Sequence, residues 1–156
     1  MQDLYAEFKA VIESFNAAGI PYAVCGGLAY SIHVEVRATI DMDFLIGEPA
    51  LPRCQQLLVQ MGYTPHPRQM VFRGGTITIQ RLWKPQEQGG DVMAIDLLIA
   101  DEALMPGVWG GREEHVWEGL SVWVVSRDGL IALKRLRGSE VDLADIRRLN
   151  EIRESE

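Results

Sequence analysis

The sequence predicts an α+β fold in which helices pack on a mixed, mostly antiparallel sheet. Apolar residues recur at helical spacing over residues 3–18, which indicates an amphipathic helix. A short apolar run at 22–25 ends in Gly26-Gly27, a pattern typical of a buried strand followed by a tight turn. The segments 70–83 and 91–100 have strand composition and are joined by a polar loop, which predicts an antiparallel hairpin.

The remaining elements follow from periodicity and from helix start and stop signals. Ser126 is a good N-cap for a helix starting at 127, and Ser139 with Asp142 resembles a capping box for a last helix, whose inward residues we expect to be Val141, Leu143, Ile146 and Leu149. We interpret 103–119 as loop-rich. We expect helices at 3–18, 28–34, 49–61, 127–137 and from about 139 onward, and strands at 22–25, 41–46, 70–83, 91–100 and 120–125.

The amino-acid composition limits the classes of protein to which the chain can belong. The chain of 156 residues is the size of one domain, with 47% hydrophobic and 24% charged residues, as in ordinary globular proteins. There is no apolar run of membrane-spanning length and no signal-peptide pattern at the N-terminus, and the two cysteines form no disulfide framework. We therefore expect a cytoplasmic protein without membrane contact. The net charge of −7 argues against non-specific binding to nucleic acid.

Three aspartates are candidate metal ligands. Asp41 and Asp43 are two residues apart on a predicted strand, so they share one face, with Cα atoms roughly 6–7 Å apart. Two like charges repel unless a cation or donors balance them, and Mg²⁺ prefers carboxylate oxygens and phosphates. Asp96 is the one charge in an apolar strand, where a lone carboxylate is costly to bury, so it is the third candidate.

The glycine turn is a candidate phosphate site. Gly26 and Gly27 allow close approach of a ligand to the backbone, and the short helix that follows would direct its N-terminal N–H groups at an anion. The three histidines, His33, His66 and His115, have no ligand spacing, and we interpret them as structural.

Two stretches of the chain resemble the nucleotidyltransferase superfamily with the DNA polymerase β-like core. The pattern Gly26-Gly27-Leu28-Ala29, a short helix and then Arg37-Ala-Thr39-Ile-Asp41-Met-Asp43 is similar to small bacterial proteins grouped with the AbiEii toxins. The C-terminal stretch from Val124 through Lys134 and Arg137 to Asp145 is also similar to that group, although Val141 stands where a lysine is usual. The resemblance implies one domain over 1–156, with a catalytic core at about 20–100 and a C-terminal strand and helical hairpin at about 120–153.

The function implied by this resemblance is transfer of a nucleoside monophosphate from an NTP to an acceptor hydroxyl. Asp41, Asp43 and Asp96 would hold two Mg²⁺ ions, with Mn²⁺ as an alternative, about 3.5–4 Å apart. Gly26, Gly27, Arg37, Thr39 and Lys134 would contact the nucleotide. The acceptor stays open among an RNA end, a protein and a small molecule, and the resemblance also implies a toxin role with a cognate antitoxin as partner.

Two other interpretations stay open. The chain could be a non-catalytic nucleotide-binding or interaction protein on the same fold. Alternatively, it could be an α+β domain whose acidic cluster binds Ca²⁺ or nothing, in which case Asp96 should be hydrogen-bonded and far from Asp41.

Overall fold

The sheet is continuous and runs through the whole molecule. The computed structural model describes residues 4–34, 41–72, 77–85, 92–100 and 106–155. In the described residues, eight strands form one sheet in the order β3-β5-β6-β2-β1-β8-β7, with β4 paired to β5. The strands are β1 (Ala23–Cys25), β2 (Asp41–Ile46), β3 (Thr64–Pro65), β4 (Met70–Phe72), β5 (Ile77–Pro85), β6 (Val92–Ala100), β7 (Glu113–Trp117) and β8 (Leu120–Val124).

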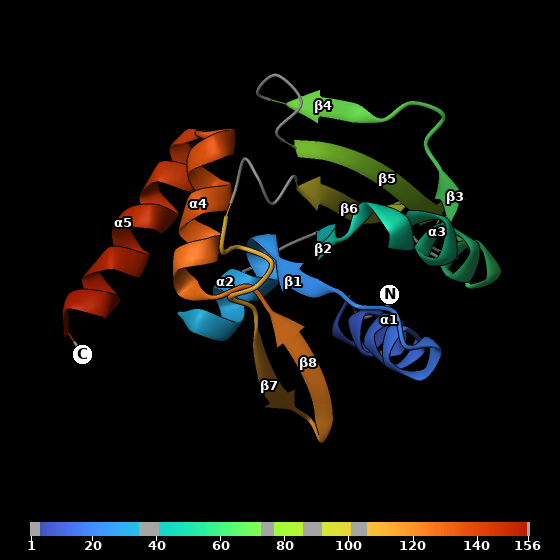
Figure 1. The fold of residues 1–156 in the computed structure, drawn as a ribbon, viewed down its shortest axis with the longest axis horizontal. Helices are drawn as coiled ribbons and strands as arrows, with labels where there is room; N and C mark the ends of the chain where they lie inside the picture. Colours follow the sequence, from blue (N-terminus) through green and yellow to red (C-terminus); the bar gives the residue numbers. More distant parts are fainter. Residues whose placement is uncertain (1–3, 35–40, 73–76, 86–91, 101–105, 156) are drawn as a thin grey trace.

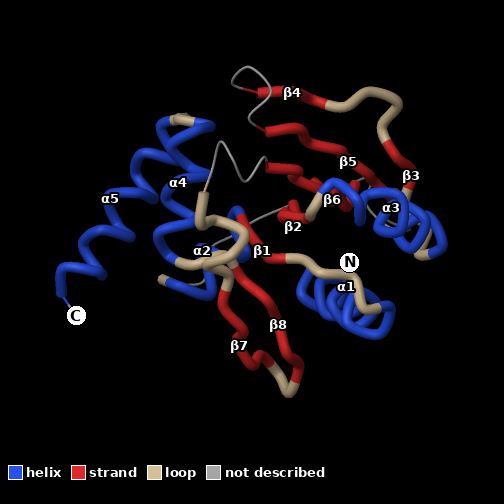
Figure 2. The backbone as a smooth tube through the Cα atoms, in the orientation of Figure 1, coloured by secondary structure: helices blue, strands red, loops and turns tan. Residues whose placement is uncertain are grey.

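Helices lie on both sides of this sheet. Figure 1 shows α4 and α5 together at one end of the molecule and α1 and α3 together at the other, and Figure 2 shows which parts of the backbone are helix and which are strand. The helices are α1 (Leu4–Ala18), α2 (Gly26–His33), α3 (Leu51–Gln60), preceded by the short 3₁₀ turn η1 (Glu48–Ala50), α4 (Arg127–Arg137) and α5 (Glu140–Ser155). None of the helices in the described ranges has both the length and the apolarity needed to cross a lipid bilayer.

The predicted sheet class is confirmed. The pairs β1–β8 and β2–β6 are parallel, whereas the other strand pairs of the described residues, including the predicted β5–β6 hairpin, are antiparallel. Strand alternation directs Phe44 to the face that α1 covers, where its ring packs against Phe8 and Phe15 of that helix. The opposite face of β2 is therefore left for the aspartates.

The strand β7 and the start of α2 differ from the sequence-based expectation. β7 lies in the segment for which the sequence predicts loop, and its residues are mostly exposed or half-buried, so it lacks the apolar alternation that would mark it as a strand. Helix α2 begins at Gly26 itself and not at Leu28, so the two glycines form its first turn. The structure thus places the glycines within the helix N-terminus and not in a separate turn before it.

The last helix faces inward through different residues than expected. Val141 and Leu143 are 59% and 47% exposed, so their predicted inward orientation is wrong, whereas Ile146 and Leu149 are buried as expected. Asp142 and Asp145 take the inward positions. The reason is Lys134 of α4, which is buried and whose Nζ donates to Asp145 Oδ2 at 2.8 Å and lies 3.9 Å from Asp142 Oδ1. Burial of a cation requires nearby carboxylates.

Both predicted helix caps are confirmed. Ser126 Oγ accepts from the Gly129 backbone N–H at 3.0 Å at the start of α4. At the start of α5, Ser139 Oγ accepts from the Asp142 N–H and the Ser139 N–H donates to Asp142 Oδ2, the reciprocal pattern of a capping box. Asp142 therefore both caps α5 and faces Lys134.

The Lys134–Asp145 pair should make a large contribution to the free energy of unfolding. Asp145→Ala removes the closest partner of a buried ammonium, so we expect a loss of about 3–5 kcal/mol, measured by urea denaturation. Val141→Ala, on the same helix but exposed, is the control and should change stability by less than about 0.5 kcal/mol. Equal effects of the two variants would contradict the structural role of the pair.

Candidate active site

Three carboxylates converge on one face of two neighbouring strands. β2 and β6 run parallel with Asp43 directly opposite Asp96. Opposite residues of paired strands point to the same face, and Asp41 shares that face with Asp43 because it is two residues away. The Asp96 side chain is 8% exposed and that of Asp41 34% exposed. The three predicted ligands are thus brought together, and Asp96 is hydrogen-bonded without being far from Asp41.

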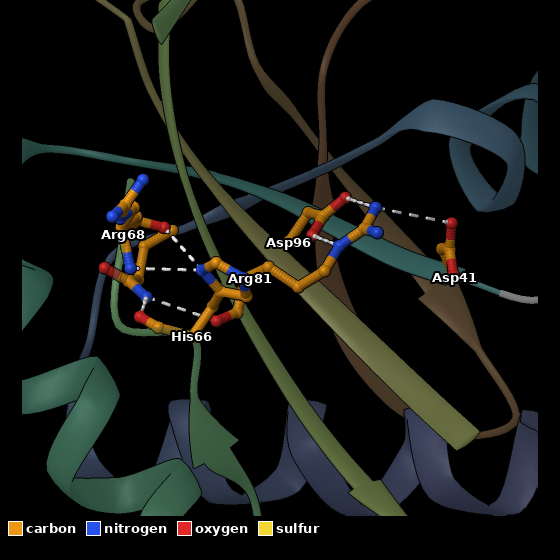
Figure 3. A network of polar contacts seen from close by, with 6 residues as sticks. Asp41, His66, Arg68, Arg81 and Asp96 are labelled. Carbon is orange, nitrogen blue, oxygen red and sulfur yellow. Dashed lines mark hydrogen bonds and ion pairs between the residues drawn. The ribbon is translucent and has the colours of Figure 1, made fainter. Parts of the chain in front are cut away.

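Arg81 of β5 lies between two of these carboxylates. Its Nε and one terminal nitrogen donate to the two oxygens of Asp96 at 2.7 and 2.8 Å. The same terminal nitrogen lies 3.9 Å from Asp41 Oδ2, as Figure 3 shows. The hydrogen bonds that Arg81 donates to Asp96 raise the pKa of the Arg81 guanidinium, while burial lowers it less, so the arginine remains charged. This cation offsets part of the repulsion among the aspartates.

Neighbouring polar groups hold the backbone of Arg81 in place. The His66 N–H donates to the Arg81 carbonyl at 2.7 Å. The buried Gln80 side chain donates to the carbonyls of His66 and Arg81. Figure 3 shows this cluster on the far side of β5 from the Arg81 guanidinium. The Arg81 side chain, which is 37% exposed, therefore extends from a fixed strand position.

Gly26 lies in direct contact with the Asp43 carboxylate. A Cβ atom built on Gly26 would lie 1.9 Å from Asp43 Oδ2 and 2.9 Å from Asp43 Cβ, so the whole Asp43 side chain would have to move. Gly26 also has φ +66°, in the region that favours glycine. The sequence at this position is thus constrained twice, by the backbone conformation and by the carboxylate next to it.

A pocket opens beside these residues. Its polar lining comes from Asp43, Asp96 and Lys134, together with Gly26. The rest of the lining is apolar and comes from Cys25, Ile77, Ile79, Leu98, Leu130, Leu133 and Leu136. The pocket is therefore bounded by the centre of the sheet on one side and by α4 on the other.

The other predicted nucleotide contacts differ in what the structure says of them. Lys134 lines the pocket, but it is not a solvated residue: its ammonium contacts Asp145 and lies 5.7 Å from the centre of the Tyr30 ring. Its contact with a triphosphate stays a prediction, as does that of Gly27. Arg37 and Thr39 lie outside the described residues.

Sequence reasoning did not single out Arg81. The signal that was available is its position in β5, where Ile77 and Ile79 precede it at alternate positions and share its face. A charge that continues an apolar face needs a partner, and the predicted β5–β6 hairpin supplies Asp96. The exact register of that hairpin, which the sequence left open, decides whether the two residues meet.

Replacement of Gly26 should destabilise the protein more than replacement of a glycine with the same backbone strain. Gly19 has φ +67° and no atom within 4 Å of the position that a Cβ would take, so Gly19→Ala isolates the cost of the left-handed backbone, about 1–2 kcal/mol. We expect Gly26→Ala to lower the free energy of unfolding by about 1–3 kcal/mol more, because of the clash with Asp43.

A double-mutant cycle tests the origin of this difference. Adding Asp43→Ala to Gly26→Ala removes the carboxylate that the new methyl group meets, so much of the extra loss should be relieved. If the losses in free energy of unfolding, measured by urea denaturation, were strictly additive, the two side chains would not be in steric conflict.

Comparison with known proteins identifies the fold. The sequence matches no protein-family model and no curated protein. Among solved structures, the lincomycin-bound lincosamide antibiotic adenylyltransferase LnuA superposes with a TM-score of 0.62 at 15% identity, covering 94% of this chain and 96% of that one. ANT(2″)-Ia in complex with adenylyl-2″-tobramycin gives 0.63 at 14% identity, covering 92% and 86%. TM1012, a proposed nucleotidyltransferase from Thermotoga maritima, gives 0.58 at 10% identity, covering 96% and 90%. The chain therefore has the nucleotidyltransferase fold.

Proposed function

We propose that the protein is a metal-dependent nucleotidyltransferase that moves a nucleoside monophosphate from an NTP to an acceptor hydroxyl. The observation that carries this proposal is the convergence of Asp41, Asp43 and Asp96 on one face of β2 and β6, beside the glycine-started helix α2. The shared fold with nucleotidyltransferases supports it, although fold alone does not assign an activity.

The donor set fits a hard divalent cation. Asp41, Asp43 and Asp96 supply only carboxylate oxygens, the ligands that Mg²⁺ and Mn²⁺ prefer. The guanidinium that lies against Asp96 and Asp41 is evidence that the cluster needs positive charge. A metal ion held there would supply charge stabilisation for the phosphates and lower the pKa of the attacking hydroxyl.

The hydrogen bonds from Arg81 decide which positions on the Asp96 carboxylate remain available to other partners. Both Asp96 oxygens accept hydrogen bonds from Arg81, so one lone pair on each oxygen remains for a metal ion or for the proton of the acceptor hydroxyl. The guanidinium head is partly exposed and is a good partner for phosphate oxygens. If its side chain turned away from Asp96, Arg81 would be placed to contact the phosphates of a bound NTP.

The apolar pocket lining favours a small-molecule acceptor. An RNA end would present phosphates and sugars to the pocket, whereas Leu130, Leu133 and Leu136 of α4 offer it no hydrogen-bonding side chain. LnuA and ANT(2″)-Ia are antibiotic-modifying neighbours with bound lincomycin and adenylyl-tobramycin, respectively. A toxin role with a cognate antitoxin rests only on the AbiEii resemblance and has no support from the pocket.

Metal-dependent NTP binding is the direct test. Titration calorimetry should detect binding of at least one NTP in the presence of Mg²⁺ and its loss in Asp41→Ala/Asp43→Ala, because the metal that bridges protein and phosphates has lost its ligands. Glu13→Ala/Glu48→Ala is the matched control, since it removes two exposed carboxylates elsewhere and should bind as the wild type does. No NTP binding with or without metal would contradict the proposal.

The second candidate is a nucleotide-binding protein that transfers nothing. The bidentate Arg81–Asp96 pair favours it, because that pair neutralises Asp96 without metal. Transfer of label from an α-labelled NTP onto a panel of hydroxylated small molecules separates the two candidates: the enzyme yields a labelled product that Asp96→Asn fails to form, and the binding protein yields none.

Removal of the Arg81 charge should strengthen binding of Mg²⁺ in the absence of nucleotide. Arg81→Met removes the cation that contacts Asp96 and Asp41. We therefore expect Mg²⁺ to bind several-fold more tightly, measured by calorimetry, and the protein to be less stable in metal-free buffer. Arg68 is exposed and lies beside His66, away from the Arg81 guanidinium. Arg68→Met should therefore leave Mg²⁺ affinity unchanged. Weaker Mg²⁺ binding in Arg81→Met would mean that Arg81 orients the carboxylates and does not compete with the ion.

A further inference from the structure

Two histidines that are far apart in sequence meet at the junction of α2 and β7. His33 is the last residue of α2, and His115 lies in β7 with Glu113 two residues before it. Each of the three side chains offers one potential ligand atom, and these atoms all lie within 4.8 Å of one another. The two imidazole rings are 5.7 Å apart and perpendicular. The histidines have no metal-ligand spacing along the sequence, but His33 and His115 lie together in the folded protein.

The hydrogen bond of His33 leaves the other ring nitrogen with a lone pair that can bind a metal. His33 Nε2 lies 2.8 Å from the Val125 carbonyl oxygen. A carbonyl only accepts hydrogen bonds, so Nε2 carries the proton and Nδ1 of the neutral ring keeps its lone pair. Metal-binding histidines commonly donate their other ring N–H to a backbone carbonyl in this way, which fixes the tautomer and the ring orientation.

His115 presents a buried nitrogen without a hydrogen bond. Its Nε2 atom is inaccessible to solvent and has no hydrogen-bond partner within the described parts of the chain. This nitrogen lies 3.8 Å from Glu113 Oε1, beyond hydrogen-bond distance. Two ligands of a tetrahedral Zn²⁺ are about 3.3 Å apart, given metal–ligand bonds of 2.0–2.2 Å, so a small shift brings both onto one ion.

We propose that His33, Glu113 and His115 bind one divalent transition-metal ion of the Zn²⁺ class. Imidazole nitrogens with one carboxylate suit Zn²⁺, Co²⁺ or Ni²⁺, in contrast to the all-oxygen set of Asp41, Asp43 and Asp96, which suits Mg²⁺. Three protein ligands leave the fourth position to water. Glu113 is 53% and His115 36% exposed, so the cluster lies near the surface of the protein.

The site would connect three elements near the candidate active site without being part of it. It joins the end of α2 to the edge strand β7, and the His33–Val125 hydrogen bond extends the connection to the residue before Ser126, the N-cap of α4. The other end of α2 carries Gly26, which contacts Asp43. Bound metal thus stabilises the hairpin β7–β8 and the helix that packs against the Asp43 carboxylate. The inference is independent of the proposed transferase activity.

Cobalt absorption and calorimetry test the proposal on the untagged, full-length chain after treatment with chelator. We expect one Zn²⁺ ion to bind in the Asp41→Asn/Asp43→Asn background, Co²⁺ to give visible absorption bands, and the thermal midpoint to rise with Zn²⁺ concentration. His33→Gln and His115→Gln should each weaken Zn²⁺ binding by at least about tenfold. Glu113→Gln should weaken it less, because the amide oxygen keeps a weaker ligand in place.

Two control variants separate this site from other metal binding. His66→Gln removes the third histidine of the chain, which lies outside the cluster, and should bind Zn²⁺ as the wild type does. Asp41→Asn/Asp43→Asn disables the carboxylate cluster and should also retain Zn²⁺ binding at the histidines. Zn²⁺ affinity unchanged in both His33→Gln and His115→Gln, or lost in Asp41→Asn/Asp43→Asn, would overturn the proposal.

Discussion

The candidate active site depends on the register of three strands. Parallel pairing of β2 with β6 sets Asp43 opposite Asp96, and antiparallel pairing of β6 with β5 sets Arg81 opposite Asp96 from the other side. A slip of one residue in either pair would turn its side chains to the opposite face. That face is packed with the aromatic rings of Phe44, Phe8 and Phe15, where a carboxylate would have no partner. Core packing on one face thus fixes the charge arrangement on the other.

The protein balances its buried acidic groups in two different ways. Lys134 is 3% exposed and held between Asp145 and Asp142, so it would lose two carboxylate contacts if it moved toward a ligand. Arg81 is 37% exposed, and water can solvate it when it leaves Asp96. Of Arg81 and Lys134, Arg81 is therefore the one suited to exchange its partners during binding. Lys134 is better suited to holding α4 against α5.

Much of the fold could be predicted from the sequence because its signals are local. Strand composition predicted β6 and a single strand over 70–83, which the structure divides into β4 and β5, and Ser126 and Ser139 predicted the starts of α4 and α5. The aspartates could also be predicted, since Asp41 and Asp43 share a face by spacing alone and Asp96 is the one charge in an apolar strand. The Arg81–Asp96 pair needed the hairpin register, and the inward turn of Asp142 and Asp145 needed the position of Lys134, both of which are set by tertiary contacts. His33 and His115 meet only through the packing of α2 against an edge strand with no apolar pattern.

Helix α2 links the two sites because of its short length. Its first residue, Gly26, has no room for a side chain beside Asp43, so any displacement of the helix toward β2 moves that carboxylate. Its last residue, His33, is fixed by Val125 at the junction between β8 and α4. A helix of eight residues is about 12 Å long and transmits a shift at one end to the other as a rigid body. The strand register sets Asp43 opposite Asp96, α2 adds a steric limit on the Asp43 side chain, and the histidine cluster lies where the far end of that helix is held.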